Sequence, residues 1–180
     1  MSSTNQAIGW ALQTLGQYSL VSAVVAWIVD QATVQASVRL RAPADVVWQL
    51  LLRKDTFLHV TRGMVGFTDV DRWPARLFTE GVTLTTGVRL FGIGPATQYT
   101  VEVVRVDDAR MEIETREHGG LIESWKHHLQ VQPLAADECL YTDRIELRAG
   151  VATPLVWLFT AVFYRYRQWR WRGWVRASQA

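Results

Sequence analysis

Residues 38–48 read VRLRAPADVVW, and this stretch joins two different patterns. Apolar and polar residues alternate from 34 to 41, which is typical of a strand with one buried face. Pro43 ends the alternation, because proline has no N–H to donate to a sheet ladder. Residues 44–53 then place Val47 and Leu51 at helical spacing. The stretch therefore predicts a strand that leads directly into a short helix.

Downstream of this stretch the pattern becomes mostly that of strands. A second short helix is predicted around Lys54–Val60, and residues 61–78 are irregular. The segments beyond them alternate at roughly ten-residue spacing with short polar connections, which predicts an antiparallel meander. The five predicted strands are Val82–Phe91, Thr97–Val106, Arg110–His118, Leu121–Gln132 and Leu140–Arg148.

A long helix is predicted to end the chain, over Pro154–Arg176. Thr153 suits an N-cap, and Pro154 suits the first position of a helix. The order of elements is then one strand, two short helices, five strands and a long helix, which predicts an α+β domain with an antiparallel sheet. The predicted core face of the long helix comprises Leu155, Leu158, Phe159, Val162, Tyr166 and Trp169.

This order resembles the helix-grip fold of the START-like (SRPBCC) superfamily, which includes polyketide cyclase/dehydrase-like proteins. The Ala-Pro pair with Val47-Trp48 is similar to the family's first strand and helix. Three further stretches are similar to the sequences of an uncharacterised bacterial subgroup of this family: residues 125–127, residues 141–145 and the Arg-rich residues 163–170. The likeness covers about residues 33–176. It implies a curved antiparallel sheet wrapped around the long C-terminal helix, with a cavity between them for an apolar ligand.

Length and composition fit one folded domain. The chain has 180 residues, of which 49% are hydrophobic and 20% are charged, which excludes a disordered protein. The net charge of +2 is unevenly distributed. Residues 1–29 carry no charge, residues 30–150 carry 14 basic and 17 acidic side chains, and residues 151–180 carry five Arg and no acid. We expect an N-terminal extension over 1–32 and a helix-grip domain over 33–180.

The uncharged N-terminal segment has the length of a membrane span but not its composition. Residues 8–29 could cross a bilayer by length. Polar residues such as Gln13 and Gln17 interrupt the segment, and no Lys or Arg precedes it as in a secretory signal. This favours a segment packed on the domain or lying on a membrane surface. The single cysteine, Cys139, excludes an intrachain disulfide and fits a reducing compartment. We expect a cytoplasmic protein, with membrane association as an alternative.

The candidate catalytic residues lie on the two strands of the last hairpin. Alternation places Glu123 and His127 on the cavity face of one strand, and Asp143 on the same face of the next. A connecting loop over 133–137 would put His127 opposite Asp143, whereas a shift of two residues would pair it with Ile145. A His beside a carboxylate is either an acid/base pair or a satisfied buried polar pair.

Three functions are compatible with these patterns. The first is the binding of a small hydrophobic, lipid- or polyketide-like molecule. The second is a polyketide cyclase- or dehydratase-like enzyme that uses His127 and Asp143. The third is a membrane-peripheral or partner-binding module that uses residues 8–29. The ligand-binding residues predicted for the first function are Leu84, Glu123, Trp125, Leu129, Tyr141, Leu158, Phe159, Val162 and Tyr166, and the membrane-contacting side chains predicted for the third are Trp169, Trp171 and Trp174.

Metal, cofactor and nucleic acid are not expected as partners. A zinc site needs three or four converging ligands. His127 and His128 are adjacent on a predicted strand and point to opposite faces, so only Glu123 shares a face with His127. The basic residues of the last helix are not continued by a second basic stripe, which argues against nucleic acid.

Overall fold

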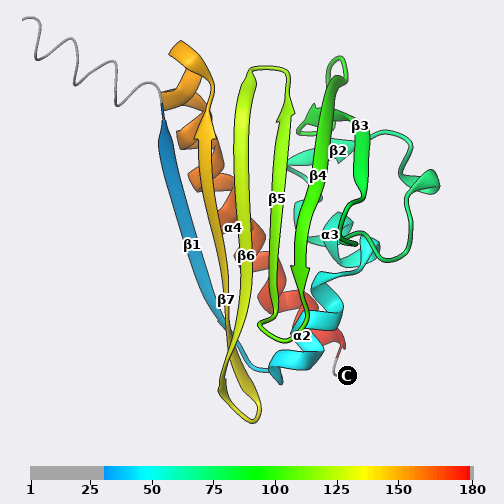
Figure 1. Cartoon of the computed structure of the whole chain (residues 1–180), viewed down its shortest axis with the longest axis vertical. Helices are drawn as coiled ribbons and strands as arrows, with labels where there is room; N and C mark the ends of the chain where they lie inside the picture. Colours follow the sequence, from blue (N-terminus) through cyan, green and yellow to red (C-terminus); the bar gives the residue numbers. More distant parts are fainter. Residues whose placement is uncertain (1–30, 179–180) are drawn as a thin grey trace, which may run out of the picture.

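The structure is a computed structural model that describes residues 31–178. A seven-stranded sheet curves around one long helix, α4 (Figure 1). The predicted α+β arrangement, with a curved antiparallel sheet against the C-terminal helix, is confirmed. In chain order the elements are β1 (Ala32–Leu40), α2 (Ala44–Leu51), α3 (Lys54–Thr61), β2 (Val65–Phe67), η1 (Val70–Arg72), β3 (Thr83–Leu90), β4 (Thr97–Asp107), β5 (Glu112–Gly119), β6 (Ile122–Ala135), β7 (Glu138–Arg148), η2 (Gly150–Ala152) and α4 (Thr153–Ser178).

The strands lie in the order β1-β7-β6-β5-β4-β3-β2, and every neighbouring pair is antiparallel. The β3 to β7 strands form the predicted meander. β1 pairs with the last strand, so α2 and α3 carry the chain from one edge of the sheet to the other (Figure 1). β2 and η1 were not predicted, because three residues are too few to show a periodicity.

The main hydrophobic core lies where α2, α3 and the C-terminal half of α4 meet the sheet. Val47 and Leu51 of α2 belong to the same buried cluster as Leu129 of β6 and Trp171 of α4. A second cluster fills the space between the first half of α4 and the β1–β7 edge, around Ile145. Apolar burial of this kind is the main term that favours folding. The two clusters leave the region between β3–β5 and the start of α4 for the site.

The predicted core face of α4 is wrong for most of its residues, although Phe159 packs against the core. Leu158 and Val162 are 55% and 54% exposed, and Trp169 is 62% exposed. Hydrophobic spacing identified the more apolar side of the helix, but the opposite side is the one that packs on the sheet. That side carries Arg167, which reaches a buried carboxylate on β7. The buried residues of α4 are Thr153, Thr160, Phe163, Tyr164, Arg167, Gln168, Trp171 and Val175.

Two of the three tryptophans predicted to contact a membrane are packed against the domain. Trp171 is fully buried, and its ring lies 5.1 Å from that of Tyr141. Trp174 is partly buried, stacks on His59, and donates from Nε1 to Thr56 Oγ1 at 3.0 Å. Trp169 alone of the three is exposed. Residues 8–29 lie outside the described residues, and within 31–178 no helix is apolar enough over a sufficient length to span a membrane.

Candidate functional site

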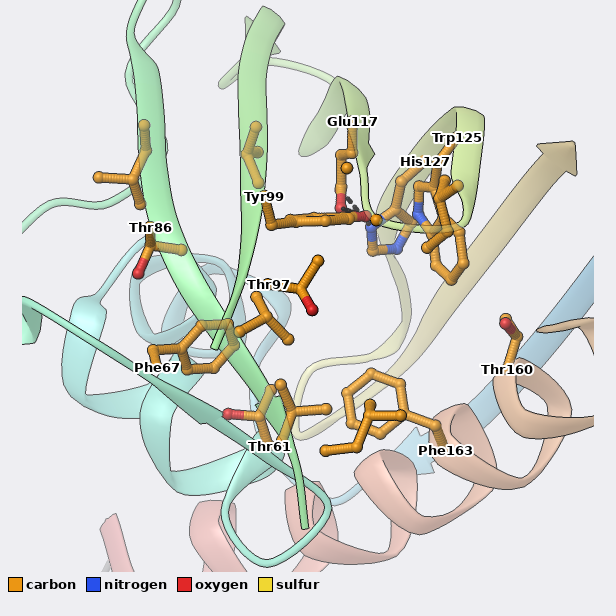
Figure 2. Close-up of a pocket in the computed structure, with 18 of the residues that line it drawn as sticks. Thr61, Phe67, Thr86, Thr97, Tyr99, Glu117, Trp125, His127, Thr160 and Phe163 are labelled. Atoms are coloured by element: carbon orange, nitrogen blue, oxygen red, sulfur yellow. Dashed lines mark hydrogen bonds and ion pairs between the residues drawn. The ribbon is translucent and has the colours of Figure 1, made fainter. Parts of the chain in front are cut away.

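A cavity of about 760 Å³ opens between the concave face of β3–β5 and the first half of α4. This volume is within the range of small-molecule sites in proteins. Figure 2 shows side chains from both layers pointing into it, with Thr86 and Tyr99 on the sheet side and Thr160 and Phe163 on the helix side. Most of the wall is apolar. Among its apolar residues are Phe57, Val65, Phe67, Leu84, Val88, Val101, Val103, Ile122, Trp125, Val156, Phe159 and Phe163.

One part of the cavity wall is polar and centres on Glu117 of β5. Tyr99 donates a hydrogen bond from its hydroxyl to Glu117 Oε2 at 2.8 Å, and Thr115 donates to Oε1 at 2.7 Å. His127 Nδ1 lies 3.5 Å from the same Oε1 (Figure 2). The Tyr164 hydroxyl is 3.4 Å from Nδ1. Tyr99, Glu117, His127 and Tyr164 all line the cavity.

Behind this wall, His127 is held from its other nitrogen by Asp143 of β7. Nε2 lies 3.0 Å from Asp143 Oδ1, which also accepts a 2.6 Å hydrogen bond from the Tyr141 hydroxyl. Arg167 of α4 donates to Tyr141 at 3.2 Å, and its Nη1 is 3.9 Å from Asp143 Oδ1. Asp143 is fully buried and does not line the cavity. The site thus holds two acids and two bases whose charges balance.

The charged forms of these groups stabilise one another. Burial by itself lowers the pKa of His127, but hydrogen bonds to Asp143 and Glu117 outweigh it and raise that pKa. Burial raises the pKa of Asp143, but the charge of Arg167 and the hydrogen bond to His127 leave it below its ordinary value. The pKa of Glu117 is likewise lowered by His127 against the effect of burial. These shifts all favour the charged forms, an imidazolium between two carboxylates.

This arrangement limits the chemistry that His127 can perform. An imidazolium that donates from both nitrogens is a proton donor and a fixed positive charge rather than a general base. Asp143 acts through His127, so it positions the ring and does not itself line the cavity. Burial and the Glu117 charge raise the pKa of Tyr99 well above its usual range, so its hydroxyl stays protonated. The wall therefore offers hydroxyl groups, the His127 ring, the Glu117 carboxylate and the Arg167 guanidinium beside a large apolar surface.

Comparison with known proteins identifies the fold. No protein-family model matches the chain, and no curated protein matches it in sequence. Solved structures do match. An aromatase/cyclase from Streptomyces superimposes with a TM-score of 0.64 and 13% identity, over 83% of this chain and 96% of that one. The chain has the START-like helix-grip fold. A START superfamily protein from Mycobacterium smegmatis (TM-score 0.60, 14% identity, 81% and 97% covered) agrees with this assignment.

An enzyme of a different activity shares the same helix-grip fold. A point mutant of norcoclaurine synthase from Thalictrum flavum, bound to a transition state analogue, matches with a TM-score of 0.61 and 12% identity, over 83% of this chain and 97% of that one. One fold thus carries unrelated reactions, so the activity of this chain has to be argued from its own cavity.

Four of the sequence-predicted site residues line the helix-grip cavity: Leu84, Trp125, His127 and Phe159. Asp143 lies directly behind His127. The hairpin register is the shifted one, with His127 opposite Ile145 and Leu129 opposite Asp143. Only residues 136–137 separate β6 from β7, and the pairing shifts by one residue between Pro133 and Ala135. The His–Asp contact forms across the diagonal of the ladder, where side chains two residues apart still meet.

The other predicted ligand-binding residues do not line this cavity. Leu129 and Tyr141 face the same side of the sheet but are fully buried in the core under α2 and α4. Glu123 is exposed near the turn before β6. Leu158 and Val162 lie on the solvent side of α4, as described above. Tyr166 donates its hydroxyl to the Arg62 carbonyl at 2.7 Å instead.

Sequence reasoning missed Glu117 and Arg167, although both left a signal. Glu117 follows Ile113 and Thr115 at a spacing of two residues, so alternation places its carboxylate on the buried face of β5. Arg167 follows Thr160 and Tyr164 and precedes Trp171 at helical spacing. Within residues 31–178 no three His, Cys, Asp or Glu side chains are grouped to hold a metal ion.

Proposed function

We propose that this protein binds a small, mostly apolar molecule in the cavity between the sheet and α4. The observation that carries the proposal is the cavity of about 760 Å³, whose wall is mostly apolar and has one polar region formed by Tyr99, Glu117, His127, Tyr164 and Arg167, besides scattered threonines. Apolar contact supplies affinity at roughly 25 cal/mol per Å² removed from water, and a few placed polar groups supply orientation. The ligand class is a lipid- or polyketide-like molecule with one polar end at His127.

A cavity-filling variant with a matched control tests this function. Val101 lines the cavity on β4, and its neighbour Glu102 is exposed on the other side of the sheet. We expect Val101→Trp to reduce the binding of an environment-sensitive apolar dye at least tenfold, and Glu102→Trp to leave it within about twofold. Native mass spectrometry of the purified protein would identify a co-purifying ligand. Equal dye binding by both variants would refute the cavity as the site.

A second candidate function is that of a cyclase- or dehydratase-like enzyme. It is favoured by one observation, that His127 lines the cavity while Asp143 holds its far nitrogen at 3.0 Å. In this site the imidazolium would turn its Nδ1–H from Glu117 to a carbonyl or departing hydroxyl group of the ligand, and the Glu117 carboxylate would accept the proton removed from the neighbouring carbon. Incubation with a poly-β-ketone thioester, followed by mass spectrometry, tests it. Cyclised product from the wild type but not from His127→Gln supports the enzyme, and equal yields contradict it.

A further inference from the structure

The solvent side of α4 carries an unusual row of apolar side chains. Their spacings along the chain are three, four and seven residues, which places them along one side of the helix. The four residues are Leu155, Leu158, Val162 and Trp169. All four are exposed, and this side lies opposite the one that packs on the sheet. Isolated exposed apolar residues are ordinary, but a contiguous row of them marks a contact surface. We call these four residues, with the Arg residues described next, the outer face of α4.

Basic side chains share the outer face. Arg165 and Arg172 are exposed and lie at the same helical spacing, and Arg176 continues the row. None of the three forms an ion pair within residues 31–178. No Asp or Glu follows Glu146 in the chain. An apolar row flanked by cations and lacking acids is complementary to a surface that has an apolar layer beneath anionic groups.

The outer face continues into the mouth of the cavity. Leu155 belongs to both, because it lines the cavity and is exposed. The other exposed apolar lining residues are Leu90, Ile93 (74% exposed) and Leu121 (69% exposed). They come from the ends of β3 and β5 and the turns that follow, at the same end of the molecule as the start of α4 (Figure 1). The ring of Phe91 reaches that of Phe159 on α4 across 6.3 Å.

We propose that the outer face of α4 and the cavity mouth dock on an anionic lipid bilayer. The apolar row would enter the interface between headgroups and acyl chains, and the arginines would contact lipid phosphates. Trp169 is suited to this layer because its ring has an apolar body and one N–H. Docked in this way, the mouth faces the acyl chains, and an apolar ligand reaches the cavity without crossing water. The docking itself does not require the proposed ligand function.

Charge complementarity selects this partner over two others. A second copy of the chain would bring the same arginines against themselves, at the cost of like-charge repulsion. Residues 8–29 carry no acid and so offer no counter-charge to Arg165 and Arg172. An anionic bilayer satisfies both the apolar row and the cations.

Thiol labelling at the outer face tests the proposal on the full chain. Cys139 is fully buried, so Val162→Cys places a single accessible thiol on the face. We expect a maleimide to label it rapidly in free protein, and vesicles of phosphatidylcholine with phosphatidylglycerol to slow labelling at least tenfold. Vesicles of phosphatidylcholine alone should have little effect. Arg39→Cys, exposed on β1, should react equally under all conditions. Slow labelling without vesicles would show that a second copy or residues 8–29 cover the face, and would overturn the proposal.

Flotation with the same vesicles tests the role of charge. Each basic side chain near an anionic surface contributes about a fivefold gain in binding. Arg165→Gln with Arg172→Gln should therefore weaken binding about 30-fold. Arg39→Gln with Arg116→Gln, both exposed on the sheet, should change it by less than about threefold. Equal losses in the two double variants, or equal binding to neutral vesicles, would contradict docking through this face.

Discussion

Replacing Asp143 by Asn should destabilise the protein more than any other carboxylate-to-amide change in β7. Asp143 is fully buried, and one of its oxygens serves His127, Tyr141 and Arg167 together. The amide of Asn keeps the shape and one acceptor oxygen but removes the negative charge. The site then holds two cations and one carboxylate in a medium where an unpaired charge is costly.

The size of the loss follows from that imbalance. Removing one partner of a buried ion pair typically costs about 3–5 kcal/mol, because the other charge stays buried and uncompensated. In Asp143→Asn the uncompensated group is Arg167, which is buried on α4 and lines the cavity. We expect a loss of about 3–5 kcal/mol in the free energy of unfolding at neutral pH.

Urea unfolding followed by tryptophan fluorescence and by circular dichroism measures this loss. Glu146→Gln is the matched control, since Glu146 lies on the same strand and pairs at 3.2 Å with the exposed Arg144. Surface pairs contribute little, so the control should lose less than about 1 kcal/mol. The proposed charge balance would be refuted if the two variants lost equal stability, or if Asp143→Asn lost less than about 1 kcal/mol.

Three other predictions concern pH, the thiol and the long helix. The pKa of His127 is raised in the folded protein, so its stabilising contribution is complete below about pH 6.5 and is lost as pH rises through the folded-state pKa. The free energy of unfolding should therefore fall with pH in this range, and His127→Gln should abolish the fall. Parallel curves for the wild type and the variant would contradict the assignment. Burial, with a smaller effect of Glu138, raises the pKa of Cys139 to about 11, so iodoacetamide near about pH 8 should modify it only after unfolding; rapid modification of the native chain would show that β7 opens locally. Gly173 lies in α4 with no atom near its absent side chain, so Gly173→Ala should stabilise the protein by about 0.5–1 kcal/mol in thermal unfolding, and a decrease in Tm would indicate a neighbour at that position.

Most of the sheet was predictable from residue alternation, because buried residues alternate with more exposed ones along β1, β5, β6 and β7. The limits of α4 were also predictable, since Thr153 and Pro154 mark its start. The face that α4 buries was not. Periodicity measures how apolar a side is, and it counts Arg167 and Gln168 against burial. It does not show that Arg167 faces the buried carboxylate of Asp143 on β7.

The site was also predictable in part from residue alternation along the strands. His127 and Asp143 meet in space in the second of the two registers left open by the sequence, with His127 opposite Ile145, because a histidine ring reaches across the ladder diagonal. Glu117 was visible as a carboxylate on a buried face. Leu129 was assigned to the cavity although it packs in the core, because alternation gives the face of a sheet but not the position along it where a cavity opens.

The balanced charges around His127 also have a consequence for synthesis on the ribosome. The charged groups are spread along the chain, from Glu117 on β5 through His127 and Asp143 to Arg167 on α4. The nascent sheet therefore carries more acid than base in its concave face until the last helix has left the exit tunnel. We expect the chain to remain unfolded up to that point and then to fold in one late step. Truncation before Arg167 would therefore abolish folding and not merely lower the stability of the folded state.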